Sequence, residues 1–274
     1  MADVNPLKQA YPTLSPTCSK KVFCIAGILT AVYGLDELTA NHNGVACGTA
    51  LDVSQLMDYL SSYAFPLQHT CITKHLVCGV SLGGHAAWHC LFNDPRISAA
   101  ISIVGCPDYY RLMEDRARLS KVSSWQDGVF RGSKDFSNGL VEAIEKHDPV
   151  ASIIKDLYLG DEVWSLLDNN INMKQQQLLA TRLTSRLTGK RLLNMSGGAD
   201  KLVPYRCSEP FVNFLTQAIG PAGCLNGSDF HMKDKVFDGV GHEMTPDMAA
   251  EVNRFVLETL IQTPTSSHMN KSKI

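Results

Sequence analysis

The sequence lacks the features by which several classes of protein are recognised. Its 274 residues contain no apolar run of the roughly 18 residues that a membrane-spanning helix needs. Its 25 basic and 27 acidic side chains give a formal net charge of −2 with no basic stripe, which argues against binding to nucleic acid or to an acidic membrane surface. Neither G-x-x-x-x-G-K-[ST] nor G-x-G-x-x-G occurs, so the sequence gives no support for nucleotide binding.

Cysteine is present, but not in the patterns that bind metal. None of the nine cysteines stands in a C-x-x-C pair, and none shares a metal-ligand spacing with a nearby histidine. Residues 1–6 are polar and lack the basic and apolar regions of a signal peptide. We therefore expect reduced cysteines, no metal, no cofactor and a cytoplasmic location.

One segment, residues 79–84, carries a recognisable chemical pattern. It reads G-V-S-L-G-G, follows the apolar run 76–78 and precedes the helix-like segment 85–92. A strand, then G-x-S-x-G, then a helix is the context of a nucleophile elbow, a tight turn that presents its serine at the carboxyl edge of a sheet. Glycines 79 and 83 occupy the positions where side chains would collide. Ser81 is therefore a candidate nucleophile, and the alternative is an ordinary serine at a strand end.

A serine hydroxyl is a weak nucleophile unless a base and an orienting acid accompany it. Candidates for both follow in the order Ser, Asp, His that this kind of turn uses. Segment 192–204 is an apolar strand and a glycine turn that lead to Asp200. Segment 236–246 is a short strand followed by His242 on a loop before a helix.

Together these three pieces resemble the α/β-hydrolase superfamily, in the branch of serine esterases and prolyl-oligopeptidase-like hydrolases. The motifs are G-x-S-x-G-G at 79–84, G-x-x-D-x-x-V-P at 197–204 and G-x-G-H at 239–242, and each follows a strand. The surrounding sequence is similar to uncharacterised fungal members. The resemblance implies an α/β fold: a mostly parallel sheet flanked by helices, shortened at its N-terminal side, with a helical cap insertion.

The resemblance also assigns roles to the residues that match its motifs. Ser81 would attack a carbonyl carbon, and His242 would take the serine proton and return it to the leaving group. Asp200 would hold the imidazole in the correct tautomer. The backbone N–H of Leu82 would stabilise the oxyanion that forms.

The acid and the base each have rivals. Asp108 follows the strand before the one that leads to the preferred acid, which is where some members of the superfamily place it. Asp238 is expected inside the last strand and is badly placed. His85 and His89 lie on the helix after the serine, where helix geometry points them away from its hydroxyl or into the packing. His231 is expected in a polar, solvated loop.

The segment before the elbow is short for this superfamily. It offers one strand at 20–29, apolar on both faces as in a buried parallel strand, a loop-like stretch at 39–48, and one helix from Asp52 to about Tyr63. The usual arrangement has two or three more strands, including the one that supplies the second oxyanion donor. Here the backbone at 27–30 is the only candidate for that donor.

We divide the chain into four parts, with the core in two pieces. They are an N-terminal lead-in at 1–19, an α/β-hydrolase core at 20–106 and 190–262, a helical cap insertion at 107–189, and a disordered tail at 263–274. The insertion is expected to form helices at 109–119, 136–146, 149–157 and 172–187. It would act as a lid over the active site or pack at the side, and its candidate pocket residues are Trp125, Phe130, Trp164 and Met173.

The expected function is a serine hydrolase that cleaves an ester or thioester of a small organic substrate through an acyl-enzyme, in fungal specialised metabolism. Two alternatives stay open. The same fold could serve an acyltransferase or product-releasing enzyme, or a catalytically impaired, hydrolase-like binding protein. The expected partner is a small-molecule acyl substrate, with no nucleic acid and no membrane. The sequence does not determine the oligomeric state.

Overall fold

The computed structural model describes residues 20–29, 38–65, 70–155, 157 and 172–261. The expected lead-in at 1–19, the expected tail at 263–274 and Trp164 lie outside these residues.

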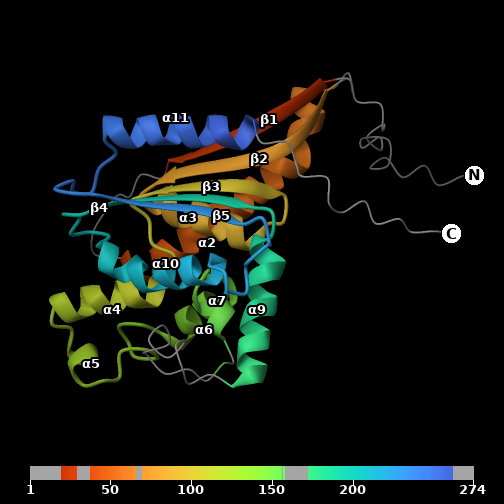
Figure 1. Cartoon of the computed structure of the whole chain (residues 1–274). Coiled ribbons are helices and arrows are strands. Elements are labelled where there is room, and N and C mark those ends of the chain that lie inside the picture. The colour runs from red at the N-terminus through yellow and green to blue at the C-terminus, as the bar shows by residue number, and fades with distance from the viewer. Residues whose placement is uncertain (1–19, 30–37, 66–69, 156, 158–171, 262–274) are drawn as a thin grey trace, which may run out of the picture.

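The described strands form one parallel sheet in the order β1-β2-β3-β4-β5 (Figure 1). They are β1 (Lys20–Leu29), β2 (Thr70–Val80), β3 (Ile97–Ile103), β4 (Arg191–Gly197) and β5 (His231–Phe237). Because all strands run the same way, their carboxyl ends meet at one edge of the sheet. The predicted fold class, a mostly parallel sheet flanked by helices, is confirmed.

Helices cover both faces of this sheet, as parallel strands require (Figure 1). They are α2 (Leu38–Ala64), α3 (Leu82–Asn93), α4 (Tyr109–Leu119), α5 (Ser123–Gln126), α6 (Asn138–His147), α7 (Ala151–Ile154), α9 (Met173–Leu187), α10 (Tyr205–Ile219) and α11 (Pro246–Ile261). Helix α11 lies on one face, and α2, α3 and α10 lie on the other. In the part of the chain that the structure describes, no helix is both long and apolar enough to cross a bilayer.

The central strands are buried on both faces, and alternate residues enter different cores. Ala100 of β3 and Leu192 of β4 pack with the helices on the α3 side. Their neighbours Ile101 and Leu193 pack with Phe255 of α11 on the opposite side. This double burial explains why these strands read as continuous apolar runs in the sequence.

Helix α2 corrects the sequence analysis. Residues 39–48, expected to be a loop, belong to one 27-residue helix, and Asp52 lies inside that helix instead of capping it. The buried positions are Ala46, Val53 and Met57, and Ala50 packs beside them on the same core. This spacing of three and four residues places one apolar stripe against the core, and the burial of that stripe outweighs the weak helix propensity of Gly44 and its polar neighbours.

The residues expected to form a cap pack in two different ways. Tyr110 of α4 and Phe136 share a separate apolar cluster with Cys207 of α10. Ile153 of α7 and Leu183 of α9 instead join the main core on the α3 side. The first half of the insertion is therefore a layer of its own, and the second half packs at the side of the sheet.

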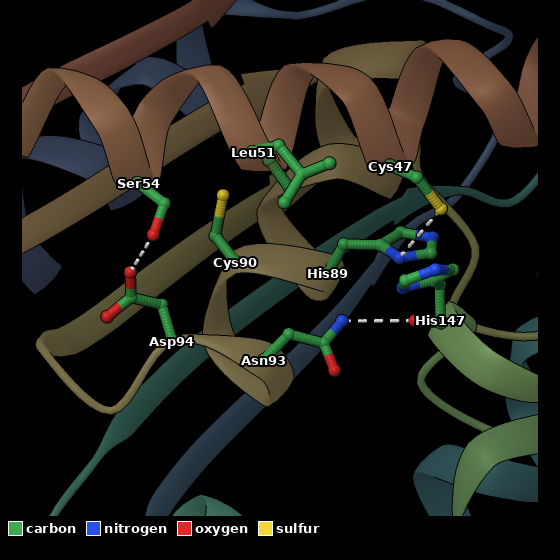
Figure 2. A pocket seen from close by; sticks show the side chains of 9 residues that line it. Cys47, Leu51, Ser54, His89, Cys90, Asn93, Asp94 and His147 are labelled. Atoms are coloured by element: carbon green, nitrogen blue, oxygen red, sulfur yellow. Dashed lines mark hydrogen bonds between the residues drawn. The ribbon is translucent and has the colours of Figure 1, made fainter.

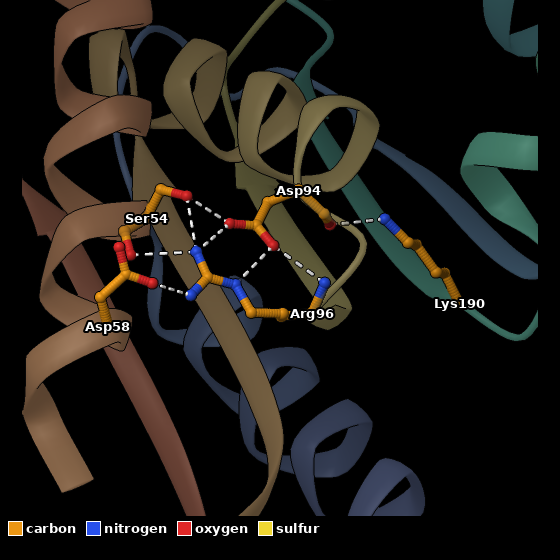
Figure 3. Close-up of polar contacts among 5 residues, drawn as sticks. All are labelled: Ser54, Asp58, Asp94, Arg96 and Lys190. Atoms are coloured by element: carbon orange, nitrogen blue, oxygen red, sulfur yellow. Dashed lines mark hydrogen bonds and ion pairs between the residues drawn. The ribbon is translucent and has the colours of Figure 1, made fainter. Parts of the chain in front are cut away.

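A dense polar network holds the carboxyl end of α3 (Figure 3). The carboxylate of Asp94 accepts hydrogen bonds from the backbone N–H of Arg96 (2.9 Å) and from its guanidinium Nε (3.0 Å) and Nη2 (2.7 Å). It also accepts from the hydroxyl of Ser54 on α2. Arg96 in turn pairs with Asp58 of α2. The network joins α2, α3 and β3 at the edge of the sheet opposite the elbow.

Lys190 completes this end of the helix from the other side (Figure 3). Its ammonium donates to the carbonyl oxygens of Leu91 (2.5 Å) and Asp94 (2.8 Å). Carbonyl groups in the last turn of a helix have no partner within the helix. A buried cation that satisfies two of them also complements the negative end of the helix dipole.

Candidate active site

The elbow at Ser81 is a strained turn between β2 and α3. Ser81 has φ 57° and ψ −116°, a conformation that side-chain-bearing residues rarely adopt. A Cβ added to Gly79 would lie 1.9 Å from the carbonyl oxygen of Gly83, so only glycine fits there. The backbone N–H of Ser81 donates to the carbonyl of Ile103 on β3 at 2.8 Å. The turn is therefore pinned to the neighbouring strand, with its serine side chain at the sheet edge.

Helix α3 lies unusually close to the end of β3. A Cβ added to Gly105 would come within 2.6 Å of the carbonyl carbon of Gly84, and one added to Gly84 would come within 2.8 Å of the carbonyl oxygen of Ile103. Val104 has φ 46°, and its N–H donates to Met195 of β4 at 2.7 Å. These contacts fix the first turn of α3 against the sheet edge, and backbone strain of this kind is concentrated at functional sites.

Three predicted site residues meet in one hydrogen-bonded chain. Ser81 Oγ lies 2.7 Å from Nε2 of His242. Nδ1 of the same imidazole lies 2.7 Å from Oδ2 of Asp200. Asp200 is 5% exposed and its carboxyl side chain is fully buried, whereas the imidazole side chain keeps 20% of its surface exposed. The chain thus runs from a buried acid to a serine at the sheet edge.

The two loops that carry the acid and the base are joined by their backbones. The N–H of Gly198 donates to Phe237, and that of Ala199 donates to Val240, both at 2.8 Å. A Cβ added to Gly197 would lie 2.3 Å from the carbonyl oxygen of Gly241, so glycine lets the second loop cross the end of β4. The glycines in these two sequence motifs therefore set the distance between acid and base.

The environment of Asp200 favours its carboxylate form. Burial on its own would raise the pKa of Asp200, but the hydrogen bond with His242 and those from two backbone N–H groups outweigh burial and lower it. The backbone donors are Val203 at 2.9 Å and Leu202 at 2.8 Å, both to Oδ1. Oδ1 is thus fixed by the loop, and Oδ2 is left for the imidazole.

Leu82, the predicted oxyanion donor, is the first residue of α3. The side chain of Ser81 does not cap the helix, because it points to His242. The first backbone N–H groups of a helix have no partner within it and carry the positive end of the helix dipole. The N–H of Leu82 therefore belongs to a turn that is suited to an anionic oxygen.

The rival acids and bases lie elsewhere. Asp108 caps α4 by accepting from the N–H of Arg111 at 3.0 Å, and His242 contacts Asp200 instead. Asp238 is an exposed residue in the turn after β5, not inside the strand.

The rival histidines are accounted for as well. Nδ1 of His85 accepts a hydrogen bond from the N–H of Cys106 at 2.9 Å. His89 is 4% exposed and lies against Cys47. His231 is exposed at the start of β5, so it is a strand residue and not a loop residue, although it is solvated as expected.

A separate pocket of about 70 Å³ lies between α2 and the end of α3. Figure 2 shows the side chains that line it. Here the Sγ of Cys47 lies 3.7 Å from Nδ1 of His89, which invites comparison with a thiol–imidazole pair. Burial and the nearby Asp148 raise the pKa of Cys47 to about 12, and burial lowers the pKa of His89 to about 3. Burial therefore disfavours the reactive thiolate form of Cys47 in this pocket.

Two of the predicted pocket residues serve the packing of the insertion. Phe130 is 7% exposed and Trp125 packs against the same cluster. Met173 is 84% exposed at the start of α9. Across the described ranges, no group of three or more His, Cys, Asp or Glu side chains is arranged to hold a metal ion.

Sequence reasoning missed the backbone donors that hold the acid. Every residue except proline has an N–H, so no residue type marks Leu202 and Val203 for this role. The available signal is spacing, because an aspartate readily accepts from the N–H groups two and three residues further on.

Comparisons with known proteins follow this geometry. No family model and no curated protein matches the chain. A candidate dipeptidyl aminopeptidase IV from Bacteroides ovatus has a TM-score of 0.51 and 10% identity, over 89% of this chain and 32% of that one. Pyrococcus horikoshii acylaminoacyl peptidase has a TM-score of 0.46 and 12% identity, over 91% and 37%. Zea mays acyl-protein thioesterase 2 has a TM-score of 0.36 and 16% identity, over 84% and 71%.

The chain spans 64% of the length of the matched Arabidopsis thaliana SOBER1 structure. At these identities a structural likeness speaks to the fold alone. The parallel sheet, its flanking helices and the Bacteroides match together show that this chain has the α/β-hydrolase fold.

Proposed function

We propose that this protein is a serine hydrolase that cleaves an ester or thioester of a small organic acid through an acyl-enzyme. The observation that carries the proposal is the chain Ser81–His242–Asp200, with both contacts at 2.7 Å, mounted on a strained elbow. A serine, a base within hydrogen-bond reach and an acid that orients the base are the parts that acyl transfer needs.

The geometry accounts for the direction of proton transfer. Asp200 accepts the Nδ1–H of His242, so the neutral imidazole leaves Nε2 as a proton acceptor facing Ser81 Oγ. The serine oxygen attacks the carbonyl carbon as its proton moves to Nε2. The imidazolium then protonates the leaving alcohol or thiol, and the acyl group stays on Ser81. A water molecule, deprotonated by the same Nε2, releases the acid and regenerates the enzyme.

The oxyanion formed in each step needs hydrogen-bond donors. We assign one to the N–H of Leu82 at the start of α3. For the second, β1 is the relevant strand, because its last residue, Leu29, pairs with Val80 immediately before the elbow. We keep the predicted backbone at 27–30 as the second donor. Its residues 27–29 pair with β2 up to the elbow, and Thr30 lies outside the described residues.

The acyl-enzyme is common to hydrolysis and to acyl transfer, so the nature of the acceptor decides between them. The proposal is hydrolysis, in the cytoplasm, with no metal or cofactor in the chemical steps. If an added alcohol or amine diverted most of the acyl group from water, the protein would be an acyltransferase of the same fold.

A burst experiment tests the proposal. The protein is mixed with 4-nitrophenyl esters and thioesters of increasing acyl length, and the first turnover is followed by released chromophore and by intact mass. We expect a burst close to one equivalent and a mass increase that maps to the peptide containing Ser81. Ser102→Ala is the matched control, because Ser102 is a fully buried serine near the end of β3 that takes no part in the hydrogen-bonded chain Ser81–His242–Asp200. A folded protein that acquires no acyl group would favour the binding-protein alternative.

A further inference from the structure

Arg116 of α4 reaches the loop that carries the proposed acid. Its Nη2 donates to the carbonyl oxygen of Leu202 at 2.9 Å. The N–H of the same Leu202 donates to Oδ1 of Asp200 at 2.8 Å. One residue therefore separates the guanidinium from the carboxylate, and the two hydrogen bonds hold that residue from both sides.

Among the residues that the structure describes, this guanidinium differs from its neighbours in having no carboxylate partner. Arg118 and Arg206 both pair with Asp115, at 2.9 and 2.6 Å, and Arg131 pairs with Glu114 at 2.6 Å. Within the described ranges Arg116 makes no ion pair, although it is half-buried. A partly buried cation without an anionic partner is costly, so its position asks for an explanation.

The groups around Arg116 belong to the proposed active site and its supports. Burial lowers the pKa of Arg116, and four groups oppose this: Tyr109 of α4, Cys106 after β3, Cys207 of α10, and Asp200. Arginine nevertheless stays protonated at neutral pH. Asp200 is the one carboxylate among the four.

We propose that Arg116 is a positioning residue, which holds the loop 198–203 against α4 and so fixes the carboxylate of Asp200 toward His242. This inference rests on the proposed serine-hydrolase function. The bond to Leu202 keeps Oδ1 of Asp200 occupied, so that Oδ2 faces the imidazole.

The position of α4 makes this support firm. Asp115, one residue before Arg116, accepts from Nε and Nη2 of Arg206 on α10, at 3.2 and 2.6 Å. Helix α4 is thereby fixed to the core on the side of the acid loop. The first helix of the expected cap insertion, α4, thus contacts the loop that carries Asp200.

The test measures the second-order rate constant of inactivation by a fluorophosphonate at neutral pH. It compares the wild type with Arg116→Met, Arg116→Lys and Arg118→Met. The last is the matched control, since Arg118 lies on the same helix and pairs with Asp115. Thermal unfolding of each variant is recorded beside the rates, and the lysine variant keeps the charge should the methionine variant prove unstable.

We expect Arg116→Met to react about tenfold more slowly than the wild type, because the loop that orients Asp200 loses its contact with α4. Arg116→Lys keeps a donor for the carbonyl oxygen of Leu202 and should recover most of the rate. Arg118→Met should match the wild type.

Two results would overturn the inference while leaving the proposed function intact. One is an Arg116→Met variant that reacts at the rate of the wild type. The other is an equal loss of rate in Arg116→Met and Arg116→Lys, with a lowered unfolding temperature in both, which would make Arg116 merely structural. A folded wild type that does not react at all would remove the proposed function, and the inference with it.

Discussion

The two ends of helix α3 are built in opposite ways. At its amino end, Ser81 has φ 57°, its side chain caps nothing in the helix, and its hydroxyl faces His242. At its carboxyl end, Asp94 has ordinary extended dihedrals, and its carboxylate accepts from Arg96 and Ser54. One end is strained and leaves donors open, whereas the other satisfies its polar groups within the protein.

The difference shows how the fold supports a strained residue. A non-glycine residue in a sparsely populated backbone region costs about 1–3 kcal/mol and persists only where its surroundings fix it. Helix α3 is fixed by its apolar contacts on the core and by the network at Asp94, which joins it to α2. The carboxyl end thus helps to hold the amino end where the site needs it.

The largest expected effect is at the strained end. Asp200→Asn should lower kcat by on the order of 10³–10⁴-fold, because an amide that accepts poorly leaves the imidazole in the wrong tautomer. Asp108→Asn is the control, since Asp108 caps α4 and does not contact His242. Steady-state kinetics on one ester, with both variants shown to be folded, checks this. A larger loss in Asp108→Asn would contradict the assignment of the acid.

The next effect removes the elbow itself. Gly79→Ala should cost about 3 kcal/mol of stability or more, because the new Cβ meets backbone and not a movable side chain. Gly44→Ala is the matched control, because a Cβ at Gly44 meets nothing within 4 Å. That variant should be neutral or slightly stabilising. Urea unfolding measures both, and a Gly79→Ala protein of wild-type stability would show that the turn is not as tight as described.

At the carboxyl end of α3, substitutions should change the stability of the protein without changing its activity. Burial on its own would raise the pKa of Asp94. The hydrogen bonds from Arg96 and Ser54 and the charge of Arg96 outweigh burial and lower this pKa to about 2. A carboxyl group with a lowered folded-state pKa stabilises the protein above its unfolded pKa near 3.9, and this stabilisation is lost as the pH falls toward 2. Asp94→Asn should therefore cost about 2 kcal/mol at pH 7.

The difference in free energy of unfolding between the wild type and Asp94→Asn should become smaller as the pH falls from 4 to 2. Asp58→Asn is the control, because the Asp58 side chain is 55% exposed and its ion pair is worth about 0.5 kcal/mol. Chemical unfolding at several pH values measures both. If Asp94→Asn and Asp58→Asn lowered the free energy of unfolding equally, the buried Asp94 would contribute no more than the exposed Asp58, which would contradict this account.

The smallest expected change in stability separates backbone strain from chemistry at Ser81. Ser81→Gly should abolish activity and yet raise stability by about 1 kcal/mol, because glycine adopts φ near 57° without strain. Ser81→Ala keeps the strained dihedral and should leave stability nearly unchanged. Thermal unfolding of the pair decides. If both variants were equally stable, the backbone at Ser81 would not be strained.

The parts of this account that could be predicted from sequence are those that depend on particular residue types. Ser81, Asp200 and His242 each follow a strand in a glycine-marked motif, and the structure brings the three side chains together. Glycine positions such as 79 could be predicted because no other residue fits the turn. Their chemical roles stay a prediction.

Other parts depend on contacts that leave no clear mark in the sequence. The first half of α2 contains two asparagines and two glycines and so resembles a loop, yet its apolar stripe from Ala46 to Met57 buries it as a helix. Arg116 acts through a backbone carbonyl, which every residue possesses. A charged residue on an exposed-looking helix gives no sign of which loop it reaches.

The most direct test of the central claim is labelling with a fluorophosphonate probe, followed by mapping of the adduct by mass spectrometry. The account predicts that the wild type is labelled on Ser81 and that Ser81→Ala is not labelled. It also predicts that labelling of His242→Ala is slower than that of the wild type by a factor on the order of 10³ or more. Labelling of Ser81→Ala at the wild-type rate, or no labelling of a wild type shown to be folded, would contradict it.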